Sequence, residues 1–220
     1  MKLVAVIAMF CALAYASMFV VKVPVQFLDL EIKDSITVLC GLLFGPMASV
    51  LVSVIVPLLQ FLTISSTGWY GLVMNILSSL SFSLTVSLIY KYRKTFYGAI
   101  TALVTGVFAM TAVMMLANLF ITPFYLTMMT SSTVTTADVI PLIPKLLLPF
   151  NLIKAILNAA IVLLLYKPIS TIMKKTGVTE SSDSEAMKNT NTNARNIIVT
   201  VISLLLIVVS LAIILFVLRA

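Results

Sequence analysis

The stretch WYGLVMNILSSLSFSLTVSLIY, residues 69–90, decides the fold class of this chain. It carries no charged side chain, and its length is sufficient for one helix to cross the roughly 30 Å hydrocarbon core of a bilayer. Trp69 and Tyr70 stand at its first end, where aromatic pairs mark a membrane–water interface, and the basic segment 91–94 follows its last residue. The stretch therefore predicts one complete transmembrane helix.

The rest of the chain shares this apolar character. Of its 220 residues, 61% are hydrophobic and only 10% are charged, whereas soluble domains are about half apolar and about one quarter charged. A water-soluble fold of this size could not cover its surface with so few polar groups. The composition therefore indicates an integral membrane protein.

Six further apolar runs accompany residues 69–90, so we expect an all-α membrane protein. The run at 35–44 is too short to span a bilayer unless other helices shield it, and Gly45-Pro46 separates it from the next run. We interpret the first run as a retained helix rather than a cleaved signal. The expected helices are 3–21, 35–44, 47–63, 69–90, 96–121, 146–166 and 197–218.

Polar segments divide the chain into parts. Residues 22–34 form an acidic first loop, and residues 122–145 form a long loop with three prolines. Residues 177–196 are almost wholly Ser, Thr, Asn, Glu and Lys, a composition typical of a disordered linker. We expect a six-helix membrane domain at 1–173, a polar cytoplasmic linker at 174–196 and an additional transmembrane helix at 197–220.

The basic residues predict the orientation. The net charge is +7, but the Lys and Arg side chains form short clusters between apolar runs, which argues against nucleic-acid binding. If the N-terminus is cytoplasmic, nine of the 14 Lys and Arg residues face the cytoplasm, in agreement with the positive-inside rule. We expect a multi-pass protein of the bacterial cell membrane with a cytoplasmic N-terminus.

Several function classes are disfavoured. There is no histidine, and Cys11 and Cys40 lie inside apolar runs without a CxxC neighbour, so we expect neither a metal site nor a cofactor. The chain has no GxxxxGK[ST] phosphate loop and no soluble domain, so we do not expect an enzyme. If the protein transports a solute, the energy comes from another subunit.

Polar side chains inside the apolar runs are the candidate site residues. A lysine at the centre of a span costs about 3 kcal/mol on insertion scales, and Lys154 lies well inside the sixth run. Asn151, three residues earlier, projects from the same helix face. Since no carboxylate is expected in any span, we expect Lys154 to lack a protein counter-ion and to bind a ligand together with Asn118 and Asn151.

Two further asparagines have a plainer interpretation. Asn75 and Asn158 also lie inside apolar runs, where amides often hydrogen-bond neighbouring helices at roughly 1 kcal/mol each. We expect that structural role for both of them and retain Asn75 as a candidate binding residue.

The first run carries alanines at intervals of four, Ala8, Ala12 and Ala16. Such a stripe of small side chains allows another helix to approach closely. It is compatible with packing inside the bundle and with docking onto a partner subunit.

The order of segments resembles a known family. The stretches that carry the resemblance include 27–34 leading to 41–46, then NLFITPFY at 118–125 and LPFNLIK at 148–154. Over residues 3–170 the chain resembles the substrate-binding S components of energy-coupling factor (ECF) transporters, and among them the riboflavin-specific type.

That resemblance implies a six-helix bundle with an outward-facing pocket and a first loop that acts as a lid. It also implies that Asn118, Asn151 and Lys154 bind the isoalloxazine ring and that the alanine stripe faces a membrane coupling protein, which works with two ATPase subunits. We therefore expect a subunit that binds riboflavin as a transported ligand. The alternatives are an S component for FMN or another vitamin, and a flavin-binding membrane scaffold without transport.

Overall fold

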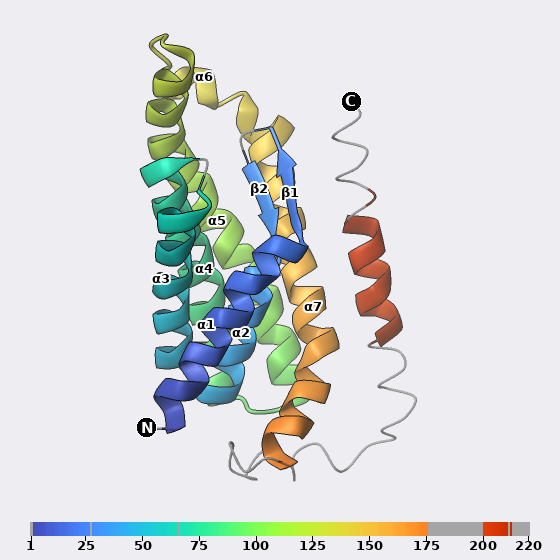
Figure 1. Ribbon diagram of the computed structural model, residues 1–220. Coiled ribbons are helices and arrows are strands. Elements are labelled where there is room, and N and C mark those ends of the chain that lie inside the picture. The colour runs from blue at the N-terminus through green and yellow to red at the C-terminus, as the bar shows by residue number, and fades with distance from the viewer. Residues whose placement is uncertain (1, 27, 66, 176–199, 211, 213–220) are drawn as a thin grey trace.

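A computed structural model of the protein describes residues 2–26, 28–65, 67–175, 200–210 and 212 (Figure 1). Within these ranges, five helices are long and apolar enough to cross a membrane. They are α1 (Lys2–Val20), α3 (Pro46–Thr63), α4 (Gly68–Tyr92), α5 (Phe96–Thr130) and α7 (Leu148–Lys175). The prediction of a helical membrane protein is confirmed.

The second predicted helix is present and is enclosed by its neighbours. Helix α2 (Lys33–Phe44) has only 12 residues, most of them buried. It contacts α1, α3, α4 and α7, which shield it from the bilayer. Because it is surrounded on several sides, α2 can carry charged residues at its start into the interior of the bundle.

Helices α2, α3 and α4 pack unusually closely. A Cβ atom added at Gly41 would lie 2.8 Å from the Cβ atom of Ser49 and 2.9 Å from that of Ser87. The Ser49 and Ser87 hydroxyls are 3.2 Å apart, and those of Ser53 and Ser83 are 2.8 Å apart. Small side chains allow this close approach, and the paired hydroxyls satisfy one another's polar groups.

The segment after α1 is a β-hairpin, where the sequence predicted an irregular loop. Strand β1 (Lys22–Val25) pairs antiparallel with β2 (Leu28–Glu31). Apolar and polar residues alternate in β2 (LDLE), but β1 (KVPV) has a single polar residue, so the strand period is too short to stand out in the sequence. In Figure 1 the hairpin lies against the end of the bundle where α7 begins.

Helix α5 is longer than predicted. The sequence placed its end at Ile121, before Pro123, but the helix continues to Thr130. Its 35 residues correspond to about 52 Å at 1.5 Å per residue, well beyond the bilayer core. Neighbouring helices and polar side chains make proline tolerable inside a membrane helix, so Pro123 does not end α5.

The predicted loop at 122–145 is consequently shorter and partly helical. It contains α6 (Thr136–Val139) and a π-helical turn, η1 (Ile143–Leu147), that leads directly into α7. The Thr135 backbone amide and hydroxyl donate hydrogen bonds to Asp138 at the start of α6 and hold the pKa of its carboxyl below the usual value.

The alanine stripe of α1 faces away from the bundle. Ala8, Ala12 and Ala16 are exposed, whereas Phe10 and Ala14 on another face of α1 are buried. Packing inside the bundle, one of the two interpretations of the stripe, is therefore wrong for this chain.

Of the predicted linker at 174–196, Lys174 and Lys175 belong to α7 and the remaining residues lie outside the described ones; the predicted seventh span is described only in part. An apolar helix covers Thr200–Ser210, and we call it the C-terminal helix. In Figure 1 it is the red helix beside α7.

Candidate functional site

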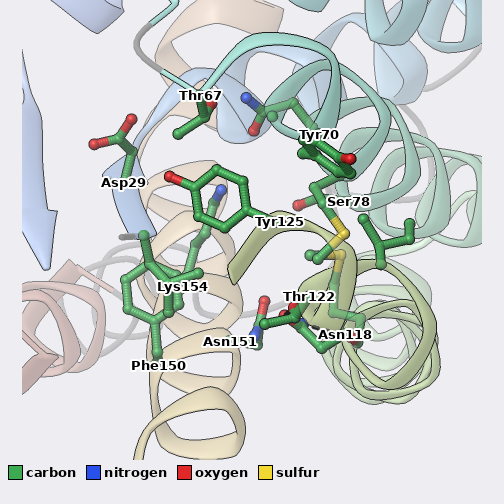
Figure 2. Close-up of a pocket in the computed structure, with 16 residues that line it drawn as sticks. Asp29, Thr67, Tyr70, Ser78, Asn118, Thr122, Tyr125, Phe150, Asn151 and Lys154 are labelled. Carbon is green, nitrogen blue, oxygen red and sulfur yellow. Dashed lines mark hydrogen bonds between the residues drawn. The ribbon is translucent and has the colours of Figure 1, made fainter. Parts of the chain in front are cut away.

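A cavity lies beneath the hairpin, between α4, α5 and α7 (Figure 2). Its walls come from the start of α4, the second half of α5 and the start of α7, with Leu28 and Asp29 of β2 at its edge. The centre of a water molecule can reach about 80 Å³ of it.

All four residues proposed from the sequence as ligand-binding line this cavity. They are Asn75 on α4, Asn118 on α5, and Asn151 and Lys154 on α7. Asn118, Asn151 and Lys154 are almost fully buried. Figure 2 shows Asn118 and Asn151 close together, with Lys154 behind the Tyr125 ring. The fold thus brings together residues from three helices that are far apart in sequence.

The two buried amides on α5 and α7 are held by their own helices. The Asn118 Nδ2 atom donates to the Met114 carbonyl at 2.7 Å, and its Oδ1 atom accepts from Thr122 at 2.8 Å. The Asn151 Nδ2 atom donates to the Leu147 carbonyl at 2.8 Å. These bonds fix both side chains, while the Asn151 oxygen accepts no hydrogen bond from the described residues.

The expectation that Lys154 lacks a protein counter-ion is wrong. Its Nζ atom lies 4.0 Å from an oxygen of Asp34, and both side chains are buried. The sequence placed Asp34 in the first outer loop. The structure places it in the first turn of α2, and the surrounding helices enclose that turn.

Asp34 belongs to a larger group of buried charges, which we call the ion cluster: Glu31, Lys33, Asp34 and Lys154. The Lys33 ammonium lies 3.1 Å from Glu31 and 3.5 Å from Asp34, and it donates to the Asn75 oxygen at 3.1 Å. Two carboxylates and two ammonium groups sum to zero charge. Buried charges are tolerated when they are compensated in this way.

Neutral side chains complete the ion cluster. Gln60 on α3 donates to Glu31 at 2.6 Å, and Ser79 on α4 donates to Asp34. Asn75 connects the cluster to Gln60 through its own amide, at 3.0 Å. The base of the hairpin is thereby tied to α2, α3 and α4.

Lys154 differs from Lys33 in how its donors are used. Lys33 hydrogen-bonds Asn75 and contacts two carboxylates. Among the described residues, the contact at 4.0 Å with Asp34 is the only polar partner of the Lys154 ammonium. Its charge is balanced, but its N–H donors remain available to a polar group in the cavity.

Asn158 has the structural role expected for it. Its oxygen accepts from the Ser35 backbone amide at 2.8 Å, and its Nδ2 atom donates to the Glu31 carbonyl at 3.0 Å. Asn158 thus fastens α7 to the junction of the hairpin and α2. Asn75 combines the expected hydrogen bonds with a position in the cavity wall.

The sequence interpretation missed the aromatic wall of the cavity. Tyr70 was assigned to the membrane interface with Trp69; Trp69 is 69% exposed, but Tyr70 lines the cavity. Its ring centroid is 5.7 Å from that of Tyr125, and Phe150 lies across the cavity on α7. The four-residue spacing of cavity residues on one helix could have revealed Tyr70, since Tyr70, Met74 and Ser78 share a face.

The cavity combines aromatic surface with a few fixed polar groups, which is the usual composition of a small-molecule site. Within the described ranges, no group of three or more His, Cys, Asp or Glu side chains could hold a metal ion. A flat, uncharged heterocycle with several acceptors and donors along one edge would match these walls.

Known proteins are similar to this chain in sequence and in fold. A family model described as the substrate-specific component of the ECF transporter matches residues 2–166. The riboflavin transporter RibU of Staphylococcus aureus (strain TCH60) is 30% identical over 174 residues, covering 77% of this chain and 90% of that protein.

A solved structure, described as the structure and mechanism of the S component of a bacterial ECF transporter, is also similar. It superposes with a TM-score of 0.63 at 29% identity and covers 79% of this chain and 98% of its own.

Proposed function

Since the chain belongs to the family of substrate-specific components of ECF transporters, we propose that it binds riboflavin from outside the cell and delivers it inward. It is a multi-pass membrane protein of a transport family. ATP hydrolysis by partner subunits would supply the energy, and riboflavin would be its transported ligand rather than a cofactor.

The observation that carries this proposal is the position of Lys154 in the cavity wall. Its ammonium has donors to spare, and Asn151 beside it offers an acceptor. The edge of an isoalloxazine ring alternates carbonyl oxygens and ring nitrogens, so it can accept from Lys154 and donate to Asn151. The apolar side of the ring can pack against Tyr70, Tyr125 or Phe150.

The size of the cavity adds a condition. About 80 Å³ is open to water centres, whereas ligand pockets usually measure about 300–1,000 Å³. A tricyclic ring therefore requires the walls to move apart. Figure 2 shows the Tyr125 ring inside the cavity, so we infer that Tyr125 turns aside when riboflavin binds, while the hairpin opens to admit the ligand and closes again over it.

The first test is a titration of purified protein with riboflavin. We expect Lys154→Met to weaken binding about 10- to 100-fold, because ring acceptors lose a buried charged donor. Lys145→Met removes a lysine from an exposed position just before α7 and serves as the matched control. An affinity unchanged by Lys154→Met would remove Lys154 from the site.

The partners and the orientation are part of the same proposal. The outward-facing alanines of α1 would contact a membrane coupling protein that works with two ATPases, and the N-terminus would be cytoplasmic. The described cavity would then open to the outside, because it lies at the end of the bundle where α1 ends. We retain the division into a six-helix domain at 1–173, a linker at 174–196 and an added helix at 197–220.

A phosphorylated flavin is the nearest alternative substrate. The ion cluster sums to zero charge and Asp29 at the cavity edge is paired with Lys22 at 3.0 Å, so these groups offer no excess positive charge for a phosphate group and favour an uncharged ligand. A different alternative is a flavin-binding scaffold without transport, which the C-terminal helix outside the family match would serve. The test is to measure riboflavin uptake in cells that produce the protein without residues 177–220. This measurement distinguishes an importer from a scaffold.

A further inference from the structure

The C-terminal helix lies outside the segment that the family model matches. Only one of its faces is buried: Ser203 is 0% and Ser210 is 4% exposed, and Ile207 between them is partly buried. These positions follow the i, i+4, i+7 spacing of one helix face. Larger apolar side chains such as Val208, 64% exposed, cover the other faces. This pattern suits a helix that turns apolar side chains toward lipid and small ones toward the protein.

Ile207 on the buried face packs against an apolar cluster that the hairpin and α7 form together. This cluster contains Val25 and Leu30 of the hairpin and Leu157 of α7. Figure 1 shows the C-terminal helix running beside α7. The contact therefore joins three elements that are separate in the sequence.

The same apolar cluster reaches the cavity wall. Leu28 of β2 and Phe150 of α7 belong to it or pack on it, and both also line the cavity. A movement of the hairpin away from α7 would separate members of this cluster, and it would disturb the packing of Ile207.

We propose that the C-terminal helix is a clamp that holds the β1–β2 hairpin closed over the cavity and slows the exchange of ligand. The part of this proposal that concerns ligand exchange rests on the proposed function. The part that concerns the hairpin stands on the packing of Ile207 alone.

The clamp affects rates more than affinity. Ile207 does not line the cavity, so its packing does not involve contact with a ligand. A contact that favours the closed state equally with and without ligand raises the barrier in both directions and leaves the equilibrium nearly unchanged.

The first test needs no ligand. Hydrogen–deuterium exchange of the backbone amides at 22–31 is measured in the purified full-length protein. We expect Ile207→Ala to raise these exchange rates about tenfold through more frequent local opening, and Ser203→Leu to do the same by forcing the helix away. Val208→Ala, on the exposed face next to Ile207, serves as the matched control and should leave the rates unchanged.

The second test uses riboflavin in stopped-flow measurements on the same variants. Ile207→Ala should accelerate both association and release about three- to tenfold, with Kd changed less than about twofold. Unchanged hairpin exchange in both Ile207→Ala and Ser203→Leu would overturn the clamp, and so would faster hairpin exchange with unchanged riboflavin kinetics. If riboflavin does not bind but the hairpin responds to Ile207→Ala, the proposed function fails while the contact between helix and hairpin stands.

Discussion

Lys154 and Asp34 show how a charge deep in a membrane protein can be balanced and still serve a ligand. The 4.0 Å separation of their charged atoms compensates the ammonium without using its hydrogen-bond donors. The sequence identified Lys154 as a buried cation but not its partner. Asp34 appeared to belong to an exposed loop, because only the packing of four helices around α2 shows that this turn is buried.

A pair of substitutions tests the charge balance of the ion cluster. Asp34→Asn leaves one positive charge uncompensated, and Lys154→Met leaves one negative charge uncompensated. We expect each to lower the free energy of unfolding by about 3–5 kcal/mol. The double variant retains only the Glu31–Lys33 pair and should recover most of the lost stability without recovering riboflavin binding.

Thermal unfolding in detergent measures this balance. The stability loss of the double variant is compared with the sum of the losses in the two single variants. Independent sites would give additive losses, whereas compensating charges give a smaller loss in the double variant. A double variant as unstable as the sum of the two single variants would show that Asp34 and Lys154 do not compensate each other.

At the scale of elements, the apolar runs predicted most helices because each is long enough to span a bilayer. The failures were local and had physical reasons. The predicted fifth helix ended at Ile121, before Pro123, but α5 continues to Thr130 because a proline is tolerated within a helical bundle. The hairpin was taken as a loop because its strands have only four residues each, too few for a clear strand pattern in the sequence. The pairing of Val23 with Leu30 becomes visible only in the folded structure.

The exposed face of α1 makes a prediction about partners. Ala12→Leu would place a bulky side chain on the stripe and prevent close approach of another helix. We expect the protein to lose copurification with the coupling protein and ATPases while its riboflavin affinity stays unchanged. Ala112→Leu, the same change at an exposed alanine of α5, is the matched control. Retained copurification in Ala12→Leu would exclude the stripe from the interface.

At the scale of the whole molecule, polar groups are concentrated at the end of the bundle that carries the hairpin. The ion cluster, the cavity asparagines and the hairpin all lie there, while the seam of serines continues from α4 toward the other end. The candidate residues on α4, α5 and α7 could be named from the sequence because amides and a lysine are rare inside apolar runs. Their convergence on one cavity could not, since it depends on how the helices pack.

The most direct test of the central claim is to identify what the purified protein carries. Protein produced in a riboflavin-containing medium is denatured, and the released ligand is examined by absorbance and mass spectrometry. We expect riboflavin without phosphate, close to one molecule per chain, and much less of it from Lys154→Met. A different vitamin, a phosphorylated flavin, or equal amounts of riboflavin from both proteins would contradict the account.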